Sequence, residues 1–163
     1  MAMTLDVHQT FPGSVDQVRA MLTDPDYARN RAEQTGSISC EVTVTAGTGG
    51  ATEVTIKRVL PANLPSFASS MVGPNLEATE QQTWAPAAGG TCTAPFEVSF
   101  SGPLGASGVI TLSGAGDQTT AHTSATIKST VPFVGGKLEK MAQEQMIKYL
   151  AKDEELGREW LSR

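Results

Sequence analysis

The sequence predicts an α+β fold in which a curved, seven-stranded antiparallel sheet wraps around one long C-terminal helix. Two observations predict this architecture. Residues Ile38–Val131 consist almost entirely of alternating, strand-like runs joined by short turns. Residues Leu138–Ser162 instead show the periodicity of an amphipathic helix. A chain of 163 residues can bury a substantial core, so we expect a single domain spanning residues 1–163.

The N-terminal segment predicts one strand followed by two short helices. Residues Thr4–Phe11 alternate between apolar and polar side chains, which is typical of a half-buried strand. Ser14 is followed three residues later by Gln17, the spacing of a capping box, so a helix is expected to begin directly after Ser14. The run Thr23–Pro25 ends that helix and is expected to cap a second one, which Gly36 ends.

Six further strands are expected in the middle of the chain. Their connections are short, so consecutive strands should pair antiparallel in a meander. Pro95 lies near the start of one of them, which indicates an edge position or a bulge, because proline cannot donate a backbone hydrogen bond. The expected strands are Ile38–Thr45, Val54–Leu60, Leu76–Trp84, Thr91–Phe100, Ser107–Ser113 and Thr119–Val131.

The C-terminal helix is expected to cover the concave face of the sheet. Its twenty-five residues, Leu138–Ser162, extend about 37 Å at ~1.5 Å per residue, close to the ~33 Å of a ten-residue strand. Seven strands in one sheet curl under their own twist. A cavity remains wherever that curl exceeds what the helix can fill. The apolar arc of the helix consists of Leu138, Met141, Ala142, Met146, Tyr149, Leu156 and Trp160.

Composition and charge exclude several classes of partner. A net charge of −5 argues against nucleic acid, because few cations are available to neutralise a run of phosphates. The sequence has no block of Lys and Arg and no apolar run near the ~18 residues of a membrane span, so no stable membrane association is expected. Cys40 and Cys92 occur singly and are interpreted as reduced thiols. With an N-terminus that lacks the pattern of a signal peptide, these features favour a cytoplasmic protein.

Four stretches, taken in their order and spacing, resemble a known superfamily. They are Ser14–Val18 before Met21–Asp24, Leu60–Phe67, Thr83–Trp84 and Val131–Glu139. Through them essentially the whole chain is similar to helix-grip proteins of the START-like, or SRPBCC, superfamily, and most similar to an uncharacterised actinobacterial family within it, a domain of unknown function (DUF2505-like). The resemblance implies a closed or semi-closed hydrophobic cavity able to hold a lipid, sterol or polyketide-like molecule. It implies no particular reaction, because cavity chemistry differs among proteins that share a fold.

Strand parity and the apolar arc of the helix select candidate ligand-binding residues. Small side chains in the last strand leave space, and methionine thioethers adapt to irregular ligands. The alternative is ordinary core packing, which residue types do not distinguish from a lined cavity. The candidates are Trp84, Val98, Phe100, Ile110, Leu112, Ala125 and Ile127 from the strands, with Met141, Met146 and Tyr149 from the helix.

Two further pairs of residues are candidates. Arg58 and Glu80 lie on successive strands and can meet inside the cavity, where they would orient a polar head group. In the alternative, which the pattern favours, their face of the sheet is solvated or the charges pair at the rim. Phe67 and Met71 belong to segment 61–74, which has no strand period. They can form a lid over the cavity or a satellite hydrophobic cluster.

The sequence contains no catalytic motif. His8 and His122 share parity with polar neighbours and are expected at the surface. No serine or cysteine nucleophile motif is present, and no group of His, Cys and Asp has metal-binding spacing. No catalytic residue, metal ion or cofactor is therefore expected.

These observations favour a protein that binds or carries a small hydrophobic molecule in the cavity, driven by desolvation of the ligand. Two alternatives stay open. One is a cavity enzyme of cyclase, dehydratase or hydrolase type, for which Glu80, Tyr149 and His122 are the candidate acids or bases. The other is a protein-interaction module with a collapsed cavity. The sequence favours no particular oligomeric state.

Overall fold

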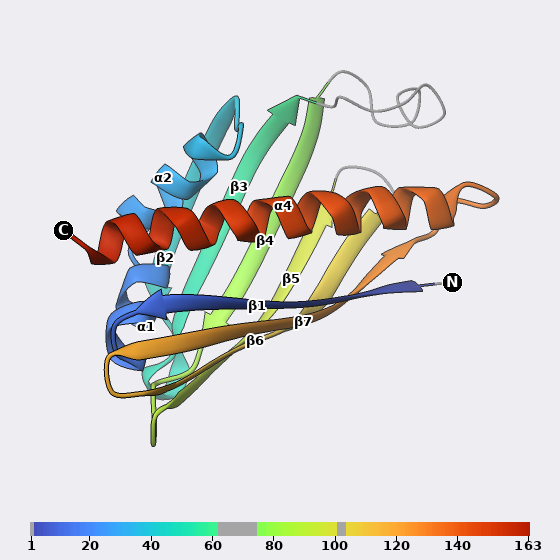
Figure 1. Cartoon of the computed structure of the whole chain (residues 1–163). Helices are drawn as coiled ribbons and strands as arrows, with labels where there is room; N and C mark the ends of the chain where they lie inside the picture. Colours follow the sequence, from blue (N-terminus) through green and yellow to red (C-terminus); the bar gives the residue numbers. More distant parts are fainter. Residues whose placement is uncertain (1, 62–74, 101–103) are drawn as a thin grey trace.

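The computed structural model describes residues 2–61, 75–100 and 104–163. Within these ranges the chain forms one seven-stranded antiparallel sheet and three α-helices, the longest of which crosses the concave side of the sheet (Figure 1). The predicted α+β fold is confirmed. The elements are β1 (Ala2–Pro12), α1 (Val15–Leu22), α2 (Pro25–Gln34), β2 (Ser39–Ala46), the 3-10 turn η1 (Thr48–Gly50), β3 (Thr52–Pro61), β4 (Asn75–Trp84), β5 (Thr91–Phe100), β6 (Leu104–Ala115), β7 (Gln118–Ser129) and α4 (Gly135–Leu161).

The sheet is a meander closed by its first strand. Its order is β1-β7-β6-β5-β4-β3-β2, so β2 to β7 pair in sequence order, as predicted. β1 lies beside β7, where Leu5 faces Ala125 and His8 faces His122. This pairing of the first strand with the last is a feature that the local sequence pattern did not predict.

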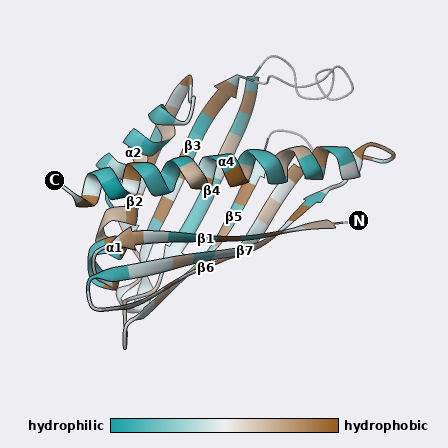
Figure 2. Ribbon diagram, viewed as in Figure 1, coloured by the Kyte–Doolittle hydropathy of each residue, from teal (hydrophilic) through white to brown (hydrophobic). Residues whose placement is uncertain are grey.

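Alternating side chains along each strand separate a concave, buried face from a convex, exposed one. Figure 2 shows hydrophobic and hydrophilic residues alternating along the strands. Period-two alternation is what a strand with one buried face requires. In β7 the buried positions are Thr119, Ala121, Thr123, Ala125, Ile127 and Ser129.

Pro95 lies in an interior strand, so its predicted edge position is wrong. β5 pairs with β4 on one side and β6 on the other. The ladder to β4 ends at the pair Gln82–Phe96, and a backbone hydrogen bond from Ala85 N to Thr93 O continues it in the same register. The predicted bulge is therefore also wrong. The missing N–H of proline interrupts the pairing without inserting a residue.

Helices α1 and α2 begin at the predicted caps. Ser14 Oγ accepts a hydrogen bond from Gln17 N at 3.2 Å, and Gln17 Oε1 accepts one from Ser14 N at 2.8 Å, which confirms the capping box. Asp24 caps α2 by accepting from Asp26 N at 2.8 Å, and Pro25 follows in the first turn. Both helices contact α4 near its C-terminal end (Figure 1).

Helix α4 packs on one side of the sheet. Its close backbone contacts are with β1 and β7 and with the two short helices, whereas β3, β4 and β5 lie further away. Gly157 permits the close approach to β1 and α1, because a Cβ at this position would lie 2.8 Å from Phe11 Cδ1 and 3.1 Å from Met21 Cε. The helix is thus held near one edge of the sheet and stands off the middle strands.

In the part of the chain that the structure describes, the buried apolar side chains form two clusters. One surrounds Phe11, Trp84 and Leu156 beneath the short helices, and the other surrounds Leu5 and Ile127 beneath the first half of α4. Among the described helices, none is long and apolar enough to cross a membrane.

Candidate functional site

A cavity of about 580 Å³ lies between α4 and the middle strands. Its volume falls within the range of roughly 300–1,000 Å³ that is typical of small-molecule sites. It exists because α4 follows β1 and β7 and leaves the concave surface of β3, β4 and β5 uncovered. The apolar part of the wall consists of Leu22, Leu60, Pro61, Leu76, Trp84, Phe96, Val98, Phe100, Ile110, Met141, Met146 and Leu150.

Nine of the predicted ligand-binding residues line this cavity. They are Arg58, Glu80, Trp84, Val98, Phe100, Ile110, Met141, Met146 and Tyr149. Three others, Leu112, Ala125 and Ile127, point to the same concave face but lie in the packed core beside the cavity, outside the described wall. Phe67 and Met71, with the lid predicted for segment 61–74, lie outside the described residues.

A buried polar network, which sequence reasoning missed, forms one end of the wall. Asp153 of α4 is 2% exposed and Arg31 of α2 is 4% exposed. Asp153 Oδ1 accepts from Tyr27 Oη at 2.7 Å, and its Oδ2 accepts from Gln9 Nε2 at 2.9 Å. Arg31 Nη1 approaches Asp153 Oδ1 at 3.4 Å. The carboxylate of Asp153 therefore joins β1 and α2 to α4.

The sequence carried a signal for this network. Gln9 has the same strand parity as Leu5 and Phe11. Arg31 follows Tyr27 by one helical turn, so both lie on the buried face of α2. Asp153 follows Tyr149 by the same interval on α4. A polar residue at an apolar position of an amphipathic pattern marks a buried polar site, and such residues are more informative than the apolar ones around them.

Arg31 is the least satisfied member of the network. Its Nε and Nη2 atoms are buried and have no hydrogen-bond partner in the described part of the chain. The guanidinium lies near two aromatic faces, 5.8 Å from the Tyr27 centroid and 5.5 Å from the Tyr149 centroid. Burial acts to lower the pKa of Arg31, but Tyr149, Asp153 and Glu80 together raise it above its ordinary value. The cavity wall therefore holds a permanent buried cation.

Arg58 and Glu80 both face the cavity, so the alternative of a solvated face is wrong. They lie on the paired strands β3 and β4, where Arg58 is opposite Ala78 and Glu80 is opposite Ile56. Each has a partner of its own. Arg58 Nη1 donates to Thr35 Oγ1 at 2.9 Å, and its guanidinium lies 4.7 Å from the Tyr149 centroid.

Glu80 belongs to a chain of hydrogen bonds along β4. Its Oε2 accepts from Gln82 Nε2 at 2.7 Å, and Gln82 Oε1 accepts from Trp84 Nε1 at 2.9 Å. All three residues line the cavity. The chain of bonds fixes the orientation of the Trp84 ring and of the Glu80 carboxylate.

Tyr149 lies between the two arginines on the cavity side of α4. Burial raises its pKa to about 12, so the phenol is neutral at physiological pH and can donate a hydrogen bond. Glu80 and Tyr149, two of the three candidate acids or bases, are thus in the wall. The third, His122, is not.

His122 lies on the opposite face of the sheet and is half-exposed, as predicted for a surface residue. Its ring stacks on His8 with centroids 4.3 Å apart, and its Nε2 lies 3.0 Å from Asp6 Oδ1. These three residues place potential metal-ligand atoms within 4.8 Å of one another. The sequence did not predict this cluster, because it depends on the register between β1 and β7.

Comparison with known proteins identifies the fold. The family described as "Protein of unknown function (DUF2505)" matches residues 6–161. An uncharacterised protein of Mycobacterium tuberculosis is 27% identical over 173 residues, covering 99% of this chain and 98% of the relative. A START superfamily protein from Mycobacterium smegmatis has a TM-score of 0.58 at 12% identity, covering 97% and 98% of the two chains. The Zhui aromatase/cyclase from Streptomyces sp. R1128 has a TM-score of 0.58 at 12% identity, covering 96% and 88%. The predicted START-like, helix-grip fold is confirmed.

Proposed function

The chain belongs to the DUF2505 family, and from this premise we propose that it binds a small, largely apolar molecule in the cavity between the sheet and α4. The cavity itself is the observation that supports the proposal: about 580 Å³ of space behind a helix that stands off the middle strands. Lipid, sterol and polyketide-like molecules are the ligand classes that such a wall accommodates. The protein acts on this view as a carrier or receptor, in a single domain and in the cytoplasm.

The apolar wall provides the driving force. A ligand that buries about 300 Å² of apolar surface gains roughly 7 kcal/mol at ~25 cal/mol per Å². Immobilising the ligand costs several kcal/mol, on the order of 4 or more. Desolvation alone therefore gives weak binding, and polar contacts must contribute the remainder. Met141 and Met146 allow the wall to adjust to the shape of the ligand.

Two adjacent residues of α4 provide a matched test of the site. Met146 lines the cavity, whereas Ile147 is 46% exposed on the outer side of the helix. We expect the neutral fluorescent probe N-phenylnaphthylamine to bind the unmodified protein. Met146→Trp fills the cavity and should weaken that binding by about tenfold or more, and Ile147→Trp should leave it unchanged. Absence of binding to the unmodified protein, or equal binding to Met146→Trp, contradicts the proposal.

Native mass spectrometry supplies an independent measurement. Protein purified under mild conditions should carry an adduct of a few hundred daltons, which Met146→Trp loses and Ile147→Trp retains. Organic extraction then identifies the chemical class of the adduct. An adduct that persists in Met146→Trp would place the ligand outside the cavity and contradict the proposal.

A cavity enzyme is the second candidate function. It is supported by Glu80 and Tyr149, which place a carboxylate and a neutral phenol in the wall of the same cavity. Such a pair can donate and accept protons in cyclase, dehydratase or hydrolase chemistry. The two functions differ in whether the ligand recovered from the cavity changes on incubation with the protein. The interaction-module hypothesis required a collapsed interior, and the open cavity argues against it.

A further inference from the structure

We propose that the ligand of this cavity carries a carboxylate head group that binds the free edge of Arg31, with the apolar part of the ligand extending along the wall toward Met141 and Val98. This inference rests on the proposed function, because it names the chemical class of molecule that occupies the same cavity. It assigns to Arg31 the role of the residue that selects an acid over a neutral analogue.

The free edge of Arg31 has the geometry of a carboxylate site. Of its three nitrogens, Nη1 approaches Asp153, whereas Nε and Nη2 have no hydrogen-bond partner among the residues that the structure describes. Nε and Nη2 donate side by side from one edge of the planar guanidinium. That edge matches the two oxygens of a carboxylate, which it binds through two parallel hydrogen bonds.

The burial of Arg31 strengthens the inference that its free edge binds a carboxylate. The side chain of Arg31 is 5% exposed, so bulk water does not replace the missing partners. Buried donors without partners destabilise a folded protein, and charged donors do so more strongly. A ligand that supplies two anionic oxygens removes this cost, and the residue already lines the cavity. The unliganded protein therefore has two unbonded buried donors on a residue of the cavity wall.

Asp153 does not supply the acceptors that Nε and Nη2 of Arg31 lack. Its Oδ1 accepts from Tyr27 at 2.7 Å and its Oδ2 from Gln9 at 2.9 Å, both shorter than its contact of 3.4 Å with Arg31. Glu80 is close enough to influence the pKa of Arg31, but its Oε2 accepts from Gln82. The carboxylates near Arg31 are thus committed to other donors.

The charge around the cavity also favours an anion. Arg31 and Arg58 are matched inside by Glu80 and Asp153, and two lysines, Lys148 and Lys152, add positive charge to the wall from α4. The whole chain carries a net charge of −5, so its acidic residues are concentrated elsewhere. Lys152 is paired with Glu155 at 3.5 Å, so Lys148 contributes most of this excess of positive charge in the wall, which attracts an anionic ligand.

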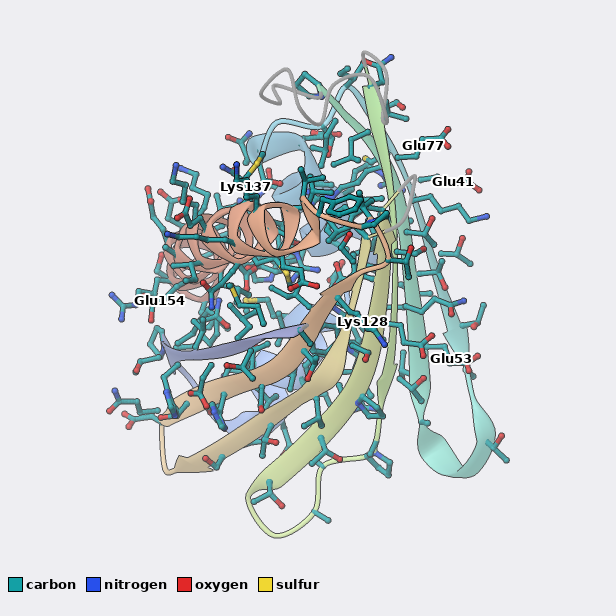
Figure 3. The ribbon with its side chains drawn as sticks, turned by 90° about the vertical axis from the view of Figure 1, so that its right-hand side faces the viewer. Glu41, Glu53, Glu77, Lys128, Lys137 and Glu154 are labelled. Atoms are coloured by element: carbon teal, nitrogen blue, oxygen red, sulfur yellow. The ribbon has the colours of Figure 1, made fainter. Side chains whose placement is uncertain are left out.

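The convex face of the sheet shows where part of that acidic charge lies. Figure 3 shows Glu41, Glu53 and Glu77 on β2, β3 and β4 pointing away from α4, and all three residues are exposed. The two faces of these strands are therefore different in charge. On the same face Lys57 lies opposite Glu41, so the convex side of these three strands carries mixed charge with an acidic excess.

A matched pair of ligands tests the head group. Dodecanoate and dodecanol share one alkyl chain and differ in the carboxylate. Each is measured by its displacement of N-phenylnaphthylamine from the unmodified protein at neutral pH, below its aggregation concentration. We expect dodecanoate to bind at least about tenfold tighter than dodecanol. Dodecyl phosphate serves as a third arm, since tighter binding of the phosphate than of the carboxylate would overturn the assignment to a carboxylic acid.

Variants of Arg31 test whether this residue causes the preference for dodecanoate over dodecanol. In Arg31→Met the ratio of the dodecanoate affinity to the dodecanol affinity should fall to about one. Arg31→Lys keeps the charge but lacks the two-donor edge, and should lose most of the preference. Arg29→Met is the control, since Arg29 is exposed on the same helix and paired with Asp26, and it should behave as the unmodified protein.

A double variant of the same site controls for folding. Should Arg31→Met unfold, Arg31→Met/Asp153→Leu removes both charges together. Tyr27 and Gln9 keep backbone acceptors in this variant, at Asp153 O (3.1 Å) and Leu150 O (2.7 Å). Equal binding of acid and alcohol by the unmodified protein overturns the inference while leaving the proposed function intact. Failure of the neutral probe to bind overturns the proposed function itself.

Discussion

Replacing Asp153 by leucine should destabilise the protein strongly, because it removes the anionic partner of a buried cation. Among the residues that the structure describes, Arg31 has one ion pair, from Nη1 to Asp153 Oδ1 at 3.4 Å, and both residues are buried. Breaking a buried pair from one side costs about 3–5 kcal/mol. Tyr27 and Gln9 add little to this loss, since each retains a backbone acceptor. The melting temperature should fall by roughly 6–20 °C, at ~2–4 °C per kcal/mol for a chain of this size.

Replacing Arg31 by methionine should lower the free energy of unfolding by less than replacing Asp153 by leucine does. In Arg31→Met the carboxylate of Asp153 keeps two donors, at 2.7 and 2.9 Å, so the loss should be about 1–2 kcal/mol. The double variant Arg31→Met/Asp153→Leu should be more stable than Asp153→Leu alone. The two losses are therefore not additive, and their coupling should exceed about 0.5 kcal/mol.

The measurement is urea-induced unfolding followed by circular dichroism and tryptophan fluorescence. The dependence of the unfolding free energy on urea should keep the same slope in all variants, so that shifts in the midpoint report stability. Glu155→Leu is the control, because the Glu155 side chain is 63% exposed, and it should change stability by no more than about 0.5 kcal/mol. The reasoning fails if Asp153→Leu costs no more than Arg31→Met, or if the two losses simply add.

Two further outcomes follow from packing and from titration. Gly157→Ala should lower the free energy of unfolding in urea by about 1–3 kcal/mol, because its Cβ would collide with the ring of Phe11. Gly136→Ala, with open space around it in the same helix, should be neutral or stabilising by up to about 1 kcal/mol, and equal stabilities of the two variants would contradict this packing. Burial raises the pKa of Tyr149 to about 12 and also raises that of Tyr27, so the folded protein should show no phenolate absorbance as the pH passes 10.0, the ordinary value. Tyrosines in the unfolded chain lose their protons near pH 10.0, before those of the folded protein do, so the free energy of unfolding should fall as the pH rises above 10.0. The fall should be less steep in Tyr149→Phe. A phenolate signal near pH 10.0 in the folded protein would refute this burial.

The order and type of the elements could be predicted because they depend on local periodicity and caps. Alternation in the strands, the Ser14 capping box and the apolar arc of the last helix each act within a few residues along the chain. Pro95 is the exception. Its missing donor was interpreted as an edge signal, but neighbours on both sides hold β5 in place through the rest of its ladder. A single interrupted bond did not decide the position of the strand.

The cavity wall could be predicted only in part, because strand parity gives the face of a residue and not its place under the helix. Val98 and Ile127 both point to the concave side, yet Val98 meets the cavity while Ile127 is packed in the core. The difference depends on where α4 crosses the sheet. That position follows from the pairing of β1 with β7, which brings together residues from opposite ends of the chain.

The same pairing sets an order of events during synthesis. Ala2 faces Lys128 and Pro12 faces Gln118, so β1 is synthesised well before its partner β7 and must wait for that strand before it can join the sheet. Contacts so distant along the chain slow folding, because a long loop must close before they form. Until then the nascent chain exposes the apolar side of β1 and an unpaired strand edge, which are features that favour aggregation.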